Sequence, residues 1–243
     1  MTDINSIYDL QIEADTFTTI MSQRKSGKSV LISNMIHHFM TNPDEAQRCH
    51  FVYVFSQTAA INEKTNHSYK FLDKRTILQP DPNLITGFWT RLRQSQIDTN
   101  MKYRILLVFD DIVVTKRYEI LDTIASLGRH FGITCILSSQ ISNNCVSPTI
   151  RNNSDYVFWR KLGKEALRDH IYPFMSISTF DDYRGLHEYT KDNTSDYTFL
   201  FYDRSKDVSD IKLVQAVDLP EDYKYQLADP KPQKRKKRSM IDW

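Results

Sequence analysis

The amino-acid sequence predicts an α/β domain with a mostly parallel central sheet flanked by helices. Apolar, strand-like runs alternate along the chain with segments of helical periodicity, which is typical of parallel strands joined by crossover helices. Two of these runs, Phe51–Phe55 and Ile105–Phe109, are apolar on both faces, as central strands of such sheets are. A length of 243 residues with 40% hydrophobic residues is enough for one domain with a sizeable core.

The expected elements follow one another in a regular order. Strands are expected at residues 16–21, 51–55, 104–109, 134–139 and 155–160, with a final pair at 197–203 and 211–217. Helices are expected at residues 28–40, 83–97, 119–127, 164–171 and 179–188. The first helix carries an apolar stripe and ends before Pro43, because proline cannot continue the hydrogen-bond ladder.

Charge separates the C-terminus from the rest of the chain. Residues 231–243 hold six basic side chains and one aspartate, a net charge of +5. Because the whole chain has a net charge of +2, residues 1–230 have a net charge of −3. Like charges at this density repel one another and cannot bury a core. We therefore expect a folded domain over residues 1–217 and a basic, disordered C-terminal tail over residues 218–243. Three roles for the tail stay open: a sequence-independent DNA tether, a nuclear localisation signal and a solubility tail.

Composition argues against several classes of protein. The longest apolar runs are about a quarter of a membrane span, and the first 15 residues are too acidic and polar for a signal or transit peptide. The three cysteines (Cys49, Cys135 and Cys145) form no CxxC pair, and their odd number argues against a disulfide framework. Histidines and acids show no spacing typical of a transition-metal site. We expect an intracellular protein in a reducing compartment, with no membrane partner.

The segment SQRKSGKS lies between the first expected strand and the first expected helix. Phosphate binding needs backbone N–H groups in a concave turn, the N-terminus of a helix and a cation that reaches the terminal phosphates. Gly27 permits the turn, Lys28 supplies the cation, and the Ser29 hydroxyl can bind Mg²⁺. Ser22 stands where the standard pattern has glycine, and the alternative interpretation is a basic surface turn. The predicted nucleotide-binding loop consists of Ser22, Gln23, Arg24, Lys25, Ser26, Gly27, Lys28 and Ser29.

Two aspartates follow the expected strand at residues 104–109. An aspartate at the carboxyl end of a parallel strand lies in the crevice where ligands bind in open α/β sheets. Asp110 is expected to hold Mg²⁺ through water, together with Ser29, and Asp111 to polarise the water that attacks ATP. Many P-loop ATPases have a glutamate there, so the shorter aspartate needs help from its backbone position or from a second residue. The alternative is a pair of solvated acids, but the two motifs together predict a P-loop NTPase that binds ATP and Mg²⁺.

A third motif runs from Gly128-Arg129-His130 into the strand that ends at Ser139-Gln140. A polar residue at the end of this strand would lie beside the γ-phosphate, where Gln140 can hydrogen-bond the attacking water and report whether the phosphate is present. Arg129 comes just before the strand and is therefore expected at the opposite edge of the domain. It could reach the nucleotide of a neighbouring subunit there, and the alternative is an exposed cation at a helix end.

These three motifs resemble those of the poxvirus-type genome-packaging ATPases, which belong to the FtsK/HerA superfamily of P-loop DNA-pumping ATPases. The resemblance extends from about residue 15 to residue 203 and includes Pro148–Asn153. The Gly-Arg-His sequence followed by a strand and Ser-Gln is more specific than the nucleotide-binding loop or the aspartate pair.

The resemblance implies a homo-oligomeric ring, often of five or six subunits, that hydrolyses ATP and translocates double-stranded DNA into a preformed viral capsid. It implies that Lys28 and Ser29 bind nucleotide, that Asp110 and Asp111 serve magnesium and hydrolysis, and that Gln140 senses the γ-phosphate. Arg129 falls where such motors place the arginine that acts in trans, with Arg151 as a second candidate. Partners would be duplex DNA and capsid or portal vertex proteins. The protein would act inside an infected host, in the cytoplasm or nucleus, and retention in the virion is a further option.

Two other functions stay open at the level of sequence. One is a plasmid- or cell-type DNA-mobilising ATPase of the same superfamily. The other is a nucleotide-gated DNA-binding or capsid scaffold protein with little turnover, which the aspartate in place of glutamate at position 111 keeps in consideration. A kinase is disfavoured, because such P-loop enzymes usually carry an arginine-rich lid.

Overall fold

One sheet organises the part of the chain that the computed structural model describes, residues 3–61, 69–112, 118–140, 146–175, 180, 182–205 and 211–227. Its strand order is β1-β9-β8-β7-β2-β6-β5-β3-β4. The strands are β1 (Ile4–Asn5), β2 (Phe17–Ser22), β3 (Phe51–Ser56), β4 (Ile77–Leu78), β5 (Ile105–Asp110), β6 (Ile133–Ser139), β7 (Tyr156–Arg160), β8 (Thr198–Asp203) and β9 (Lys212–Gln215). Neighbouring strands are parallel except where β8 pairs with β7 and β9, so the expected mostly parallel sheet is confirmed.

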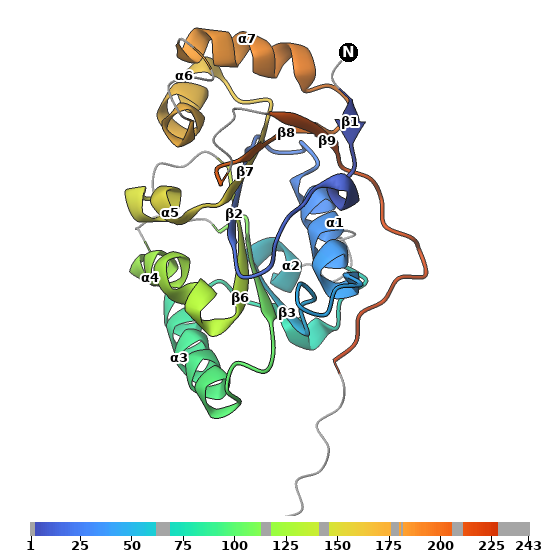
Figure 1. Ribbon diagram of the computed structural model, residues 1–243, viewed down its shortest axis with the longest axis vertical. Helices are drawn as coiled ribbons and strands as arrows, with labels where there is room; N and C mark the ends of the chain where they lie inside the picture. The colour runs from blue at the N-terminus through green and yellow to red at the C-terminus, as the bar shows by residue number, and fades with distance from the viewer. Residues whose placement is uncertain are drawn as a thin grey trace, which may run out of the picture.

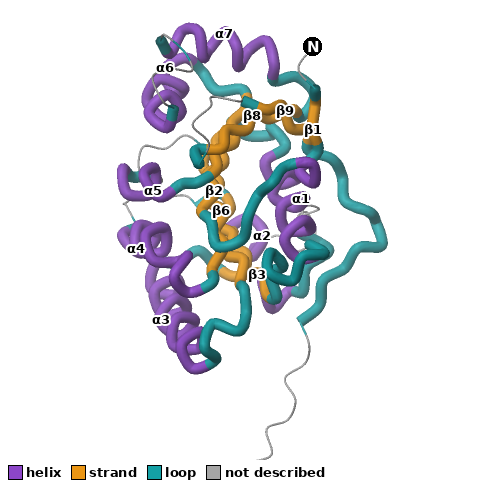
Figure 2. The backbone as a smooth tube through the Cα atoms, in the orientation of Figure 1, coloured by secondary structure: helices purple, strands orange, loops and turns teal. Residues whose placement is uncertain are grey.

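Helices cover both faces of this sheet. They are α1 (Lys28–Thr41), α2 (Gln57–Ile61), α3 (Pro82–Asp98), α4 (Glu119–Leu127), α5 (Pro148–Asn153), α6 (Lys164–Ala166) and α7 (Tyr183–Asn193). Figure 1 shows α3, α4 and α5 on one side of the sheet and α1 and α2 on the other, and Figure 2 shows the same layers by type of structure. None of the described helices is both long and apolar enough to span a membrane.

The core is divided in two by the sheet. In β5, Ile105, Leu107 and Phe109 belong to the cluster under α3 and α4, whereas Leu106 and Val108 belong to the cluster under α1. All five side chains are at most 4% exposed. Successive side chains of a strand point to opposite faces, so a strand covered on both sides must be apolar throughout. The continuous apolar runs of the sequence therefore mark the centre of the sheet.

The order of the central strands decides what can meet at the sheet's edge. Strand β6 lies between β2 and β5, with Met21 opposite Ser139 and Phe109 opposite Leu137. All three strands run in the same direction, so their carboxyl ends lie side by side. The predicted phosphate loop, the aspartate pair and Gln140 lie at the ends of these three strands or directly after them, and are consequently brought to one edge.

Local capping signals set several helix boundaries. Asp81 caps α3 by accepting hydrogen bonds from two backbone N–H groups, and Pro82 occupies the first helical position, where proline is favoured. Asp182 caps α7 in the same way, so this helix begins at Tyr183 rather than at the expected position 179. The helix expected at 164–171 is short, because α6 gives way to a π-helical turn at Leu167–Ile171. Sequence periodicity also missed β1, β4, α2 and α5.

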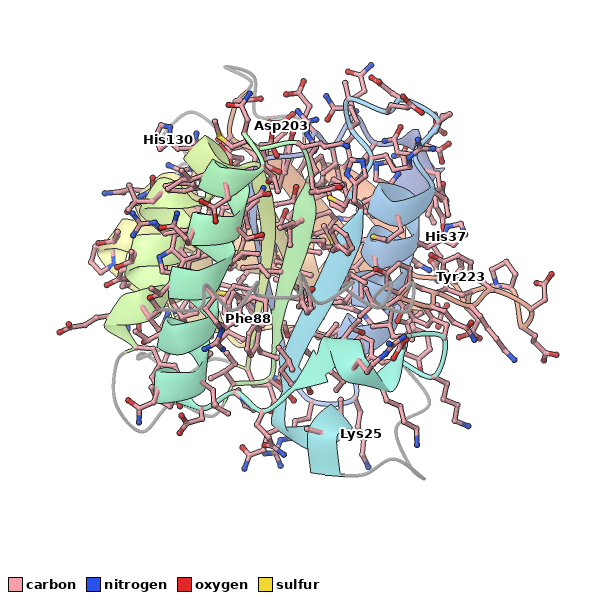
Figure 3. All side chains as sticks on the ribbon, turned by 90° about the horizontal axis from the view of Figure 1, so that it is seen from below. Lys25, His37, Phe88, His130, Asp203 and Tyr223 are labelled. Carbon is pink, nitrogen blue, oxygen red and sulfur yellow. The ribbon has the colours of Figure 1, made fainter. Side chains whose placement is uncertain are left out.

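Residues 216–227 form an extended segment, the C-terminal strap, that packs against the domain. Val217 and the side chain of Asn34 exchange two hydrogen bonds of 3.0 and 2.7 Å. The ring centroid of Tyr223 lies 4.4 Å from that of His37. Figure 3 shows these two side chains next to each other. The Tyr225 N–H donates to Phe71 O at 2.7 Å. In Figure 1 the strap runs along the α1 side of the molecule. Residues 228–243, which include the basic cluster, lie outside the described residues, and a boundary at 217/218 stays a prediction.

Candidate nucleotide-binding site

The loop between β2 and α1 is closed by its own side chains. Ser22 is the last residue of β2 and is fully buried, and its hydroxyl lies 2.6 Å from that of Ser26. Serine in place of the usual glycine is therefore accommodated by a hydrogen bond inside the loop. Gly27 caps α1 with φ of 88°, in the left-handed region, and Lys25 has φ of 56°. These left-handed residues turn the chain from the strand into the helix, so that the N-terminus of α1 opens at the edge of the sheet.

Lys28 is held inside this loop. Its Nζ donates to Ser22 O at 2.9 Å and to Gln23 O at 3.3 Å, and the residue is only 6% exposed. Asp111 Oδ1 lies 4.0 Å from Nζ. Burial lowers the pKa of the Lys28 ammonium, while the carboxylates of Asp111 and Asp110 act in the opposite direction. A cation held by two carbonyl oxygens has a third donor left for a phosphate oxygen.

Asp110 is buried at the end of β5, 4% exposed. Its Oδ2 accepts a 2.8 Å hydrogen bond from the hydroxyl of Tyr69, which also contacts the side chain of Ser29. Burial raises the pKa of Asp110, and the hydrogen bond from Tyr69 opposes that rise. Its other oxygen, Oδ1, has no well-formed hydrogen bond to any residue that the structure describes, although the Ser138 hydroxyl lies close enough to favour the ionised form.

These residues fit a magnesium ion. A buried carboxylate oxygen without a formed partner costs free energy, and a bound cation or its water would satisfy it. Asp110 and Ser29 offer hard oxygen ligands, and Mg²⁺ is commonly held by one or two such groups together with substrate phosphates and water. The structure thus brings together the two residues that sequence reasoning selected for the metal.

Asp111 is positioned by its backbone and by Gln140. The residue has φ of 54°, a left-handed conformation that aspartate tolerates better than most residues. Gln140, directly after β6, donates from Nε2 to Asp111 Oδ2. The Oε1 atom of Gln140 in turn accepts from Arg24 Nε at 2.8 Å. A chain of contacts therefore links the phosphate loop, the glutamine and the aspartate that was predicted to polarise water.

A second cation borders the loop on the other side. Arg160 ends β7 opposite Ser22, is 3% exposed, and donates through a terminal nitrogen to Ser26 O. Its Nε has no hydrogen-bond partner among the described residues, and burial lowers its pKa. The guanidinium lies 5.0 Å from the ring of Tyr197, which rests against Gly27. The charge of Asp196 opposes the lowering of the Arg160 pKa, and the phosphates of a bound nucleotide would supply a further anion.

The two trans candidates lie at the other edge of the sheet. Arg129 is in the 3₁₀ turn before β6, where it forms a 3.5 Å ion pair with Asp155 and keeps its side chain 42% exposed. Arg151 belongs to α5, which leads into the start of β7. Figure 3 shows the separation of the edges, with Lys25 of the loop at one end and His130, the neighbour of Arg129, at the other. In the described part of the chain, neither arginine makes a hydrogen bond or ion pair with the loop of its own subunit.

Three residues of the site were not selected from the sequence. Arg160 could have been, because it ends an apolar run in the same manner as Asp110. Tyr197 and Tyr69 could not be selected, since each lies in a loop, and only the fold brings that loop to the edge of the sheet where the phosphate loop lies. Tyr197 has φ of 64° and is held by a 3.2 Å hydrogen bond from the Ala216 N–H to its carbonyl. Strained backbone of this kind often accompanies functional sites.

Comparison with known proteins finds likeness in structure. No protein-family model and no curated protein matches the sequence. The DNA-packaging ATPase B204 of Sulfolobus turreted icosahedral virus is 18% identical, with 85% of this chain and 100% of that chain covered and a TM-score of 0.55. B204 of Sulfolobus turreted icosahedral virus 2, in complex with AMPPCP, is 20% identical over 84% of this chain and 98% of that chain, also with a TM-score of 0.55.

A further similar structure is the monomer of TcpA, the pCW3 conjugation coupling protein, with ATPγS. It is 13% identical over 88% of this chain and 64% of that chain, with a TM-score of 0.59. The protein has a P-loop NTPase fold. Identities this low establish the arrangement of strands and helices, and what the chain does has to be argued from its own residues.

Proposed function

We propose that this protein is an ATP-hydrolysing motor that translocates double-stranded DNA and packages a viral genome into a preformed capsid. One observation carries the proposal: a phosphate loop with a buried lysine, a buried aspartate pair and a glutamine meet at one edge of the sheet, through Lys28, Asp110, Asp111 and Gln140. This set provides phosphate binding, metal binding and activation of water, which are the parts that NTP hydrolysis requires.

The loop residues bind and orient the nucleotide in this proposal. Backbone N–H groups at the start of α1 and the ammonium of Lys28 hold the β- and γ-phosphates, and Arg160 adds a second buried cation. Ser29 and Asp110 would hold Mg²⁺, which neutralises phosphate charge when it is bound. The contacts among Arg24, Gln140 and Asp111 keep the water-activating group in place before the nucleotide arrives.

Hydrolysis then needs a proton acceptor and an oriented water. The oxygen of that water forms a bond to the γ-phosphorus while the bond between the γ-phosphorus and the β,γ-bridging oxygen breaks, which leaves ADP and phosphate. Asp111 accepts the proton that the water loses, and the Gln140 amide orients the same water. Because Gln140 orients the water and Asp111 only accepts its proton, an aspartate, one methylene shorter than glutamate, can act as the base.

The DNA-pumping part of the proposal rests on further support. Two of the similar structures are described as a DNA-packaging ATPase and a conjugation coupling protein. Arg129 and Arg151 lie at the edge away from the subunit's own loop, which suits an arginine that acts on a neighbour in a homo-oligomeric ring of five or six subunits. Duplex DNA and capsid or portal proteins are the proposed partners, inside an infected cell.

Steady-state ATP hydrolysis with and without duplex DNA tests the proposed function. We expect hydrolysis of Mg²⁺·ATP that rises when duplex DNA of any sequence is added, because a translocase grips the phosphate backbone rather than base edges. Binding of ATP without turnover, in the presence or absence of DNA, would instead support a nucleotide-gated scaffold.

The likeness to TcpA favours one alternative, a DNA-mobilising ATPase of a plasmid or cell. Both functions predict DNA-stimulated hydrolysis, so that assay does not separate them. Pull-down with capsid proteins from the same genome does: a packaging motor binds a capsid vertex protein, and a mobilising ATPase binds none.

Asp111→Asn should leave ATP binding intact and slow hydrolysis by at least ~10²-fold, because asparagine cannot take the proton from water. Binding is checked with a fluorescent ATP analogue, and turnover by phosphate release. Asp192→Asn, which changes an exposed aspartate of α7, is the control and should hydrolyse ATP at the normal rate. Normal turnover by Asp111→Asn would assign water activation to another group.

A further inference from the structure

The hydroxyl of Tyr69 lies between the two residues that would hold magnesium. It donates to Asp110 Oδ2 at 2.8 Å and contacts the side chain of Ser29. Tyr69 is 2% exposed, so water does not compete for these contacts. One tyrosine thus touches both members of the proposed metal site, from a segment about 40 residues before Asp110 in the sequence.

We propose that Tyr69 is a positioning residue for the metal ion. Its hydroxyl holds Oδ2 of Asp110, and this leaves the buried Oδ1 as the oxygen available to the metal or its water. The inference rests on the proposed nucleotide site and adds the residue that orients its metal ligand. Partners that orient metal ligands in this way typically change metal affinity by 10- to 100-fold when they are removed.

A role in packing alone does not account for the hydroxyl. Phenylalanine would fill the same space without the cost of burying a polar group. The tyrosine hydroxyl is buried, and its contacts are with Asp110 and Ser29, the two residues that would hold the metal. The backbone is held as well, because the Leu72 N–H donates to Tyr69 O at 3.0 Å and the strap binds Phe71 through Tyr225. The Tyr69 side chain is therefore fixed at its hydroxyl and at its backbone.

The surroundings of the Tyr69 ring allow a substitution that removes only the hydroxyl. Tyr69 also lines a cavity of ≈ 360 Å³ together with Ala59 and Leu72. Tyr69→Phe removes the hydroxyl and keeps the ring, so the space that the ring fills stays filled. Tyr156→Phe is a matched control. Tyr156 is 4% exposed, and its hydroxyl accepts a hydrogen bond from the Glu13 N–H, away from Asp110 and Ser29.

Manganese serves as the probe, because Mn²⁺ replaces Mg²⁺ at oxygen sites and its free form gives an EPR signal. Titration of each protein with Mn²⁺ in the presence of saturating AMPPCP, which is not hydrolysed, gives the metal affinity. A second titration with fluorescent nucleotide in EDTA gives the metal-free nucleotide affinity. For Tyr69→Phe we expect metal affinity to fall about 10-fold or more, with metal-free nucleotide affinity and melting temperature close to those of the wild type and of Tyr156→Phe.

Each other outcome contradicts the inference in a distinct way. Unchanged Mn²⁺ affinity in Tyr69→Phe would show that the hydroxyl does not orient the ligand. Equal losses of metal and metal-free nucleotide affinity would show that Tyr69 shapes the whole site instead of one ligand. Absence of nucleotide binding in the wild type would refute the proposed function itself, and the positioning role with it.

Discussion

Lys28→Ala is expected to bind ATP roughly 10- to 10²-fold more weakly and to lose hydrolysis, since the one donor of Lys28 left for phosphate makes a charge-assisted hydrogen bond worth about 1.5–3 kcal/mol. The reason is local: Lys28 Nζ is buried and held inside the loop by two carbonyls, whereas Arg160 borders the loop from β7. Lys28→Arg should not restore function, because a planar guanidinium does not fit a site shaped around an ammonium. Nucleotide binding by fluorescence and phosphate release measure both effects.

The control for this prediction is Lys102→Ala, an exposed lysine next to Tyr103 near the start of β5, at the other edge of the sheet. It should bind and hydrolyse ATP at wild-type levels. Normal turnover by Lys28→Ala would mean that Ser22–Ser29 is not the nucleotide loop, whatever its geometry.

Arg129→Ala is expected to bind ATP normally and to hydrolyse it about 10³-fold more slowly, as for other arginines that act in trans. Mixing Arg129→Ala subunits with Lys28→Ala subunits should restore part of the activity. In a mixed ring, a subunit with an intact loop then faces a neighbour with an intact arginine. Phosphate release measured over a range of mixing ratios tests this complementation.

The ion pair of Arg129 with Asp155 supplies the competing, structural explanation. This pair is 3.5 Å long and partly exposed, so its loss should cost little stability, about 0–1 kcal/mol. A large fall in melting temperature would show that Arg129 has a structural role, and no rescue at any ratio would show that it acts structurally or in its own subunit. Arg151→Ala, tested in the same mixtures, decides between the two candidates.

The central fold could be predicted from the sequence because its strongest signals are local. Buried strands with apolar residues on both faces, such as Ile105–Asp110, need no information from the rest of the chain to be recognised. The short edge strand Ile77–Leu78 could not be predicted, because two residues carry no periodicity and pair only once β3 is in place. The C-terminal strap could not be predicted either, since it has no regular periodicity and is held by contacts with α1 and with residues 71–75.

In the candidate site, too, the residues with a local sequence signal could be predicted and the others could not. Residues at the end of a strand or directly after it, such as Asp110 and Gln140, were identifiable because parallel strands end at one edge. Tyr69 was not, since its link to Asp110 depends on how the segment after α2 returns to the sheet. The position of Asp111 was identifiable, but its left-handed backbone was not, and that conformation itself favours aspartate over glutamate.

The C-terminal strap has a mechanical consequence. Leu227 is held by Asp73 and Arg75, Tyr225 by Phe71, and Val217 by Asn34 of α1. Tension applied to the chain beyond Leu227 is therefore borne first at residues 71–75, and reaches α1 only after those bonds have broken. Residue 71 is two positions from Tyr69, and α1 begins with Lys28 and Ser29. A partner that pulls on the C-terminus would load the metal side of the site before the phosphate side.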